Sequence, residues 1–242
     1  MEIGIIGFGR FGKLMAGYLA EDCKVYVSSR SNKEKEIRQL NAIPSALEEA
    51  ASRDIVIPSV PISEFESTLK KIKPFLKKGA LVMDVCSVKE YPVQIMKKVL
   101  PKGIQVLATH PMFGPDSASD SLEGRKLVLC KIRIKDALYN KIKDYAQSKG
   151  LAVIEATPQA HDGEIAKTLI LTHFIGRGLI DFGANDMNID TQGYKKIMEV
   201  MKYVKNDTWQ LFEDMNRYNK YSKKVRKDFI AALKKVNERL EK

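Results

Sequence analysis

Residues 2–12 read EIGIIGFGRFG. An apolar run typical of a buried strand (2–7) leads into a G-x-G-x-x-G motif, and a helical pattern follows at 13–20. Glycines at this spacing allow a tight turn, let a pyrophosphate approach the backbone, and let the helix pack on the sheet. The helix N-terminus also favours negative charge. We therefore expect a dinucleotide-binding strand, turn and helix here.

Short apolar runs alternate with helical patterns as far as residue 155. Strands are expected at 2–7, 24–28, 54–58, 80–85, 104–108, 126–130 and 151–155. The clearest helices between them are expected at 13–20, 64–75, 92–100 and 136–148. This alternation is typical of a parallel sheet covered by helices. The predicted fold class is α/β, with a Rossmann-type doubly wound domain at residues 1–156.

The pattern changes after Pro158, where strand-like runs nearly vanish and helical periodicity continues to the C-terminus. Residues 159–182 are apolar around most of the circumference of one expected helix, which therefore needs cover from other helices or from a second subunit. We expect residues 157–242 to form a smaller all-α domain for substrate binding and homodimerisation.

The chain has 242 residues, a formal net charge of +11, and no apolar run near the ~20 residues that span a bilayer. Its lysines are scattered and no nucleic-acid-binding motif accompanies them, so we expect neither nucleic acid nor membrane as a partner. The three cysteines form no CxxC pair, which predicts no disulfide framework and no metal site. A cytoplasmic location is expected.

The end of the second predicted strand, VSSRS at 27–31, indicates which dinucleotide is bound. An NAD-specific domain usually places an acidic residue there, whereas hydroxyls and a guanidinium suit the 2'-phosphate of NADP. NADP is therefore favoured, although Arg30 at an exposed strand end is the alternative. The residues expected to bind the cofactor are Gly7, Phe8, Gly9, Arg10, Phe11, Gly12, Ser28, Ser29, Arg30, Ser31, Ser59 and Val60.

Two candidate catalytic residues follow neighbouring predicted strands. His110 lies in THPMFGP (109–115), where prolines and a glycine constrain the backbone after the strand at 104–108. Ser87 lies in DVCSVK (84–89) and is placed to orient the imidazole, with a helix N-cap as the alternative. Histidine exchanges protons near neutral pH, so His110 is the predicted general base.

The two other histidines, His161 and His173, fall at the margins of an apolar stripe when residues 159–182 are projected as one helix. Both are candidates to face the substrate. A histidine whose hydrogen bonds are satisfied inside a helical core is the alternative for each.

The motifs together resemble the prephenate and arogenate dehydrogenase family. The resemblance is carried by THPMFGP, by DVCSVK, and by His161-Asp162 followed by THFIGR at 172–177. The likeness is closest to plant-type arogenate dehydrogenases, through Ser-Arg-Ser at 29–31, TQGY at 191–194 and NDTW at 206–209. It implies oxidative decarboxylation of L-arogenate to L-tyrosine with reduction of NADP.

The resemblance also implies substrate-binding roles for His161, His173, Thr191 and Asp207. An acidic residue at the place of Asp207 is linked in that group to preference for arogenate, whose side-chain ammonium a carboxylate attracts. An N-cap ahead of residues 209–212 is the alternative for Asp207.

Several alternatives stay open. Prephenate is the alternative substrate, and another NADP oxidoreductase, such as a 3-hydroxyacid dehydrogenase relying on Lys167 or an imine reductase, is the enzymatic rival. A non-enzymatic NADP sensor or scaffold would not need Ser87 and His110 together. The two arginines that hold substrate carboxylates in many microbial relatives are replaced here by YKKIM at 194–198. By charge alone, Lys195, Arg177 and Arg217 are candidates to bind the ring carboxylate, and ordinary solvated surface is the alternative for each.

Overall fold

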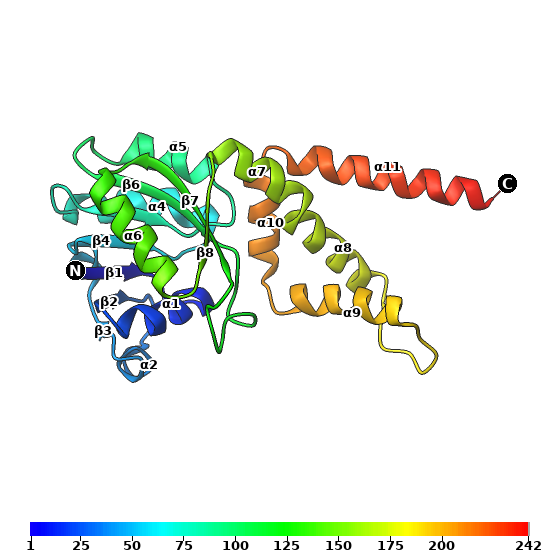
Figure 1. Cartoon of the computed structure of the whole chain (residues 1–242), viewed down its shortest axis with the longest axis horizontal. Coiled ribbons are helices and arrows are strands. Elements are labelled where there is room, and N and C mark those ends of the chain that lie inside the picture. Colours follow the sequence, from blue (N-terminus) through cyan, green and yellow to red (C-terminus); the bar gives the residue numbers. More distant parts are fainter. Residues whose placement is uncertain (242) are drawn as a thin grey trace. The chain divides into compact units, whose positions relative to one another are not determined.

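A computed structural model describes residues 1–241 of the chain. The chain divides into two compact units, Met1–Pro158 and Gln159–Lys242. In Figure 1 the first unit runs from blue to green and combines strands with helices, whereas the second is helical and runs to red.

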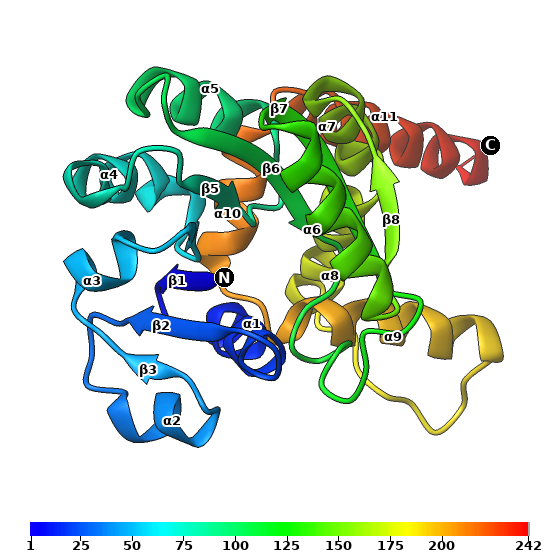
Figure 2. The ribbon, with the colours of Figure 1, turned by 60° about the vertical axis from the view of Figure 1, so that its left-hand side comes forward.

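The first unit is built on one sheet in the order β3-β2-β1-β4-β5-β6-β7-β8. All neighbouring strands are parallel except β6 and β7, which are antiparallel. Figure 2 shows β1, β2 and β3 as neighbouring arrows at one side of the sheet. The strands are β1 (Glu2–Ile6), β2 (Lys24–Ser28), β3 (Ile43–Pro44), β4 (Ile55–Pro58), β5 (Leu81–Asp84), β6 (Gln105–Pro111), β7 (Lys126–Arg133) and β8 (Ala152–Glu155).

Helices cover both faces of this sheet. Ile3 and Ile5 of β1 pack into one buried cluster with residues of α1 and α6, while Gly4, between them, faces the backbone of α3. This alternation follows from the two-residue period of a strand. The expected doubly wound α/β fold is therefore confirmed. The helices are α1 (Arg10–Ala20), α2 (Glu34–Gln39), α3 (Leu47–Ala51), α4 (Ile62–Ile72), η1 (a 3-10 turn, Lys73–Phe75), α5 (Glu90–Val99) and α6 (Asp136–Ser148).

The strand order reverses at β1, because β2 lies on one side of it and β4 on the other. In open α/β sheets, ligands bind outside the carboxyl ends of the strands at such a reversal. The strands β1, β2, β4, β5 and β6 are mutually parallel, so their carboxyl ends share one edge of the sheet. The segments that follow these strands are therefore the natural place for a functional site.

The sheet differs from expectation in three respects. The two-residue strand β3 and the short helices α2 and α3 are additions, and the strands at 104–108 and 126–130 are longer than expected. The strand β7 runs antiparallel to β6 and pairs with it as far as Pro111. Pairing with an antiparallel neighbour carries β6 through His110, which was expected in a loop.

The second unit contains α7 to α11. The expected single helix at 159–182 is wrong: the segment is two helices separated at Thr168, whose backbone is not helical (φ −109°, ψ −89°). Thr168 Oγ1 donates to the carbonyl of Glu164, 2.9 Å away. Such back-bonding to the preceding turn bends helices. The helices are α7 (Pro158–Lys167), α8 (Leu169–Asp181), α9 (Gln192–Lys205), α10 (Trp209–Tyr218) and α11 (Ser222–Leu240).

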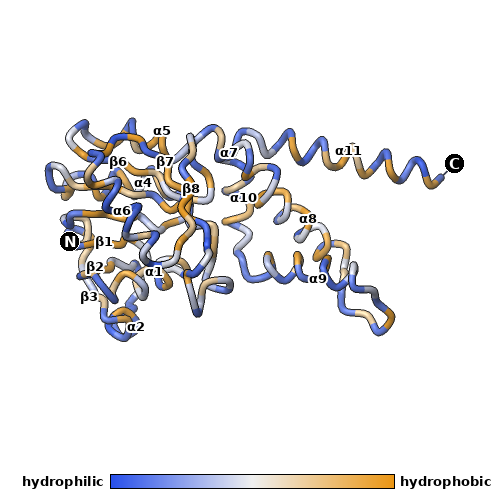
Figure 3. The backbone as a smooth tube through the Cα atoms, in the orientation of Figure 1, coloured by the Kyte–Doolittle hydropathy of each residue, from blue (hydrophilic) through white to orange (hydrophobic). Residues whose placement is uncertain are grey.

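Close packing joins α8 to α9. A Cβ on Gly176 would lie 2.6 Å from Val204 Cγ2, so a larger residue there would have to displace Val204. Helix α11 instead leaves an apolar stripe exposed, and Figure 3 shows orange and blue alternating along it. In residues 1–241, no helix combines the length and the apolar character needed to cross a membrane.

Candidate active site

The glycine motif forms a tight turn between β1 and α1. Gly7 has φ +108°, a region that L-residues rarely adopt, and a Cβ there would lie 2.3 Å from the carbonyl oxygen of Ser59. A Cβ on Gly12 would lie 2.4 Å from the carbonyl oxygen of Gly7. These two glycines are therefore needed for packing, and they bring Ser59 and Val60, after β4, against the turn.

Gly9 is different, because the space beside it is open. Among the described residues, no heavy atom outside its immediate neighbours lies within 4 Å of the position that its Cβ would take. Gly9 is also the N-cap of α1 and, as a glycine, has no side chain to cap the helix. At a helix N-terminus the first backbone N–H groups lack intrahelical partners, and together with the helix dipole they favour an anion. The turn thus fits a pyrophosphate, as the sequence predicts.

The end of β2 carries the four residues expected to select the dinucleotide. Ser28 lies against the turn, since its carbonyl accepts from the N–H of Gly7 at 2.9 Å. The side chain of Arg30 is 84% exposed and its Nη1 lies 3.0 Å from a carboxylate oxygen of Glu64. A largely solvated ion pair is weak, so Arg30 is available to another anion.

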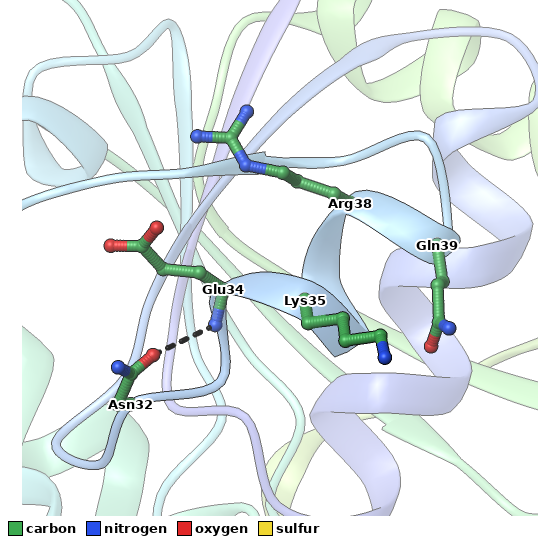
Figure 4. Close-up of a pocket in the computed structure, with 5 residues that line it drawn as sticks. All are labelled: Asn32, Glu34, Lys35, Arg38 and Gln39. Carbon is green, nitrogen blue, oxygen red and sulfur yellow. Dashed lines mark hydrogen bonds between the residues drawn. The ribbon is translucent and has the colours of Figure 1, made fainter.

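An open hollow adjoins this segment on α2. It is lined by Asn32, Glu34, Lys35, Arg38 and Gln39, and the N–H of Glu34 donates to the Asn32 side chain at 3.4 Å (Figure 4). The hollow holds none of the predicted catalytic residues. Its basic side chains, Lys35 and Arg38, add positive charge to the segment after β2, which also contains Arg30.

His110 is 3% exposed and lies on β6, where its backbone pairs with Val128. Two residues earlier, Ala108 pairs with Asp84, the last residue of β5. Ser87 follows three positions after β5 and is half-buried. The sheet therefore places both predicted catalytic residues at the carboxyl ends of neighbouring parallel strands.

A buried ion pair holds the backbone before His110. Lys89 and Asp84 are both 0% exposed, and Lys89 Nζ donates to Asp84 and to the carbonyl of Thr109. The Asp84 carboxylate also accepts from the N–H groups of Cys86 (3.0 Å) and Thr109 (3.3 Å). Burial raises the pKa of Asp84, and the Lys89 ammonium opposes that rise. The two charges lie within the DVCSVK motif, but sequence analysis assigned neither a role.

Residues 112–118, which follow β6, are fastened to α1 by three side chains. Arg10 Nη2 lies 2.6 Å from Asp116, the rings of Phe11 and Phe113 are 6.2 Å apart, and Tyr18 donates to the carbonyl of Ala118 at 3.0 Å. The segment after His110 thus contacts the helix that begins in the glycine turn. Arg10 and Phe11, which are expected to bind the cofactor, therefore also contact the segment that follows His110.

Both helix-cap alternatives for candidate residues are wrong. The N-cap of α5 is Lys89 rather than Ser87, and the N-cap of α10 is Thr208, whose hydroxyl accepts from the N–H of Leu211 at 3.1 Å. Asp207 therefore has no capping role. Thr191, an expected substrate residue, does cap a helix: its hydroxyl accepts from the N–H of Tyr194 at 3.2 Å at the start of α9.

The two histidines of the second unit have different surroundings. His161 is buried on α7, with Nδ1 2.8 Å from the carboxylate of its neighbour Asp162. His173 is buried on α8, and its Nε2 lies 3.6 Å from the Asp207 carboxylate. Burial lowers the pKa of His173, Asp207 raises it, and Arg177 lowers it further. The net direction is downward, so the imidazole is neutral at pH 7.

The fold and this edge of the sheet define a Rossmann-type nucleotide-binding protein. Residues 15–155, more than half of the chain, match the family described as "Prephenate dehydrogenase, nucleotide-binding domain", and residues 179–242 match "TYRAAT1-like, C-terminal domain". The chain belongs to the prephenate dehydrogenase family, which confirms the resemblance seen in its motifs.

Named relatives agree with this membership. The chain is 32% identical over 231 residues to arogenate dehydrogenase 2, chloroplastic, of Arabidopsis thaliana, covering 90% of this chain and 64% of the relative. It is 29% identical over 255 residues to a probable arogenate/prephenate dehydrogenase of Methanocaldococcus jannaschii, covering 98% and 56%. The chain thus spans less than two thirds of the length of either relative.

Solved structures share the fold. Prephenate dehydrogenase from Aquifex aeolicus, in complex with hydroxyphenyl propionate and NAD+, has a TM-score of 0.79 at 22% identity, covering 98% of this chain and 90% of that one. Synechocystis arogenate dehydrogenase has a TM-score of 0.71 at 22% identity, with coverage of 100% and 92%. At this identity, the agreement concerns the fold.

Proposed function

We propose that the protein is an NADP-dependent arogenate dehydrogenase, which oxidatively decarboxylates L-arogenate to L-tyrosine. The observation that carries the proposal is the position of His110. His110 is a buried histidine on β6, and Ser87 follows the adjacent parallel strand β5, at the edge of the sheet that also carries the glycine turn. A dinucleotide site and a candidate general base on one edge suit hydride and proton removal from one substrate.

Residues of the first unit would hold the cofactor. The N-terminus of α1 and the open side of Gly9 receive the pyrophosphate, while Ser29, Arg30 and Ser31 bind the 2'-phosphate. When bound, the nicotinamide supplies a hydride acceptor. The choice of NADP over NAD rests on the exposed guanidinium of Arg30 and on the lack of an acidic residue in VSSRS.

His110 would accept the proton of the ring hydroxyl when the carbon that bears this hydroxyl is oxidised. Loss of the ring carboxylate as carbon dioxide then yields the aromatic ring of tyrosine. Ser87 orients the imidazole, and the pair of Lys89 and Asp84 fixes the backbone at Thr109, next to His110. A positioned general base typically contributes ~10² to 10⁴ in rate.

Asp207 favours arogenate over prephenate because its carboxylate attracts a side-chain ammonium. It is 29% exposed and does not cap a helix, which leaves it available to a ligand. His173 beside it is neutral, so no imidazolium cancels the charge. Prephenate has a keto group in place of the ammonium and is the second candidate substrate. The relative from Methanocaldococcus jannaschii is named for both substrates.

Homodimerisation through the helical unit completes the proposal. On α11, Ile230, Leu233, Val236 and Leu240 are 41–82% exposed and recur every three or four residues along one face. Such a stripe suits a second copy of the same helix. Size measurement by light scattering tests it.

The experiment for the activity compares wild type with His110→Asn and Ser87→Ala. We expect His110→Asn to bind NADP normally but to lose turnover, because the amide cannot accept the proton. Ser87→Ala should lower kcat by less. Near-normal kcat in His110→Asn would contradict the proposal.

A further inference from the structure

A cation and an anion lie together in the second unit, on segments 30 residues apart. Arg177 of α8 donates from Nη2 to the backbone carbonyl of Asp207, in the loop between α9 and α10. The guanidinium carbon lies 4.7 Å from the centroid of the Trp209 ring, which is itself packed edge-on against Phe212. The Asp207 carboxylate lies 3.6 Å from Nε2 of His173. We call Arg177, Asp207, His173 and Trp209 the ion cluster.

The ion cluster has unused hydrogen-bonding capacity. Within residues 1–241, Arg177 Nε and His173 Nδ1 are buried and have no hydrogen-bond partner. Buried polar atoms in folded proteins nearly always have one, so each exception needs an explanation. Among the described residues, Arg177 has only its Nη2 bond to the loop and its contact with Trp209, and a guanidinium carries five N–H donors. The donors that remain can serve a partner from outside the chain.

The charges are also separate enough to act on two groups. Arg177 binds the main chain of Asp207, whereas the Asp207 carboxylate lies toward His173. Because His173 is held neutral by its burial, the cluster presents one full positive and one full negative charge. A carboxylate suits the planar fork of an arginine, and an ammonium suits an aspartate. An α-amino acid carries both groups on one carbon.

We propose that Arg177 and Asp207 form a zwitterion site, in which Arg177 binds the side-chain carboxylate of the substrate and Asp207 binds its ammonium. The inference rests on the proposed function and deepens it by assigning a carboxylate-binding residue. Arg177 serves arogenate and prephenate alike, since both carry this carboxylate, whereas Asp207 acts only on arogenate. Trp209 holds the guanidinium in place.

Three probes test the roles of Arg177 and Asp207 separately. L-tyrosine carries both a carboxylate and an ammonium, 3-(4-hydroxyphenyl)propanoate carries only the carboxylate, and tyramine carries only the ammonium. Binding of each to the full chain is measured by calorimetry with NADP present. We expect Arg177→Ala to weaken tyrosine and propanoate binding by about 10- to 100-fold and to leave tyramine unchanged. Asp207→Asn should weaken tyrosine and tyramine and leave propanoate unchanged.

Two further variants test whether the loss of binding in Arg177→Ala comes only from a change in structure. Arg177→Lys keeps the charge but not the fork, so propanoate binding should fall less than in Arg177→Ala. Lys202→Ala removes an exposed cation of α9 and should change none of the three affinities. Equal weakening of tyramine and propanoate by Arg177→Ala would show that Arg177 only holds the loop, and would overturn the proposal. The proposal would also be overturned if wild type bound none of the three probes.

This experiment is independent of turnover. If wild type oxidises neither arogenate nor prephenate, the proposed function fails, whatever the probes show. If wild type turns over arogenate but the variants bind all probes normally, the zwitterion site fails alone.

Discussion

Removing the Lys89 ammonium is expected to destabilise the protein and misplace His110. Lys89 is fully buried and donates both to Asp84 and to the carbonyl of Thr109. Lys89→Met keeps the apolar volume but leaves a buried carboxylate without its counter-ion. Breaking one side of a buried ion pair costs about 3–5 kcal/mol. A domain of this size loses roughly 2–4 °C of Tm per kcal/mol, so Tm should fall by about 6–20 °C.

A double variant separates the effect of the lost charge on stability from the effect of changed packing. Asp84→Asn with Lys89→Met removes both charges and keeps an oxygen that can accept from the N–H of Cys86. We expect the double variant to recover more than half of the lost stability. In Lys89→Met the unpaired Asp84 has a raised pKa, so its protonation favours the folded state. The deficit should therefore be smaller at low pH and grow as pH rises through the folded pKa.

Thermal and urea unfolding followed by circular dichroism measure these stabilities, and kcat at a temperature where all variants are folded measures the effect on His110. A shift of about 1 Å in a catalytic group can lower the rate ~10²-fold. Equal stabilities of the single and double variants would refute the ion-pair reasoning. An unchanged kcat in Lys89→Met would refute the positioning of His110.

Four other predictions follow from the described geometry. Gly9→Ala should leave Tm unchanged and weaken NADP binding, whereas Gly12→Ala should lower Tm because its Cβ would lie 2.4 Å from the carbonyl oxygen of Gly7; equal Tm values would contradict this. Arg30→Ala should raise KM for NADP by about 10- to 100-fold with little effect on NAD, and parallel effects would reject the 2'-phosphate contact. The lowered pKa of His173 predicts stability that is present above the unfolded pKa and lost as pH falls below it, so His173→Gln should flatten this acid dependence in unfolding titrations. Leu233→Glu with Val236→Glu should convert a dimer to a monomer in light scattering, while Lys234→Glu, at an exposed position between them, should not.

Local pattern was enough to predict most of the first unit. The seven expected strands exist because each is a short apolar run between turn residues, and the glycine turn has the geometry that its spacing indicates. The strand β3 has only two residues and α2 is largely polar, so neither has a periodicity to detect. The apolar pattern does not reveal the break between α7 and α8 at Thr168, because this break depends on one hydroxyl that bonds to the preceding turn.

The candidate site was predictable only where it lies in continuous motifs. His110, Ser87 and the glycine turn follow strand ends, and the sheet topology then brings those ends to one edge. The contact of Arg177 with Asp207 spans 30 residues and depends on how α8 packs against the loop before α10. Likewise, the fastening of residues 112–118 to α1 depends on tertiary packing more than 90 residues apart in the chain. Such contacts have no signature in local sequence.

The proposed activity is tested most directly by turnover of arogenate and prephenate, each with NADP and with NAD, followed at the absorbance band of the reduced nicotinamide. We predict the largest kcat/KM for arogenate with NADP, release of carbon dioxide and tyrosine in equal amounts, and loss of turnover in His110→Asn. Absence of nicotinamide reduction with all four pairs would contradict the proposed activity.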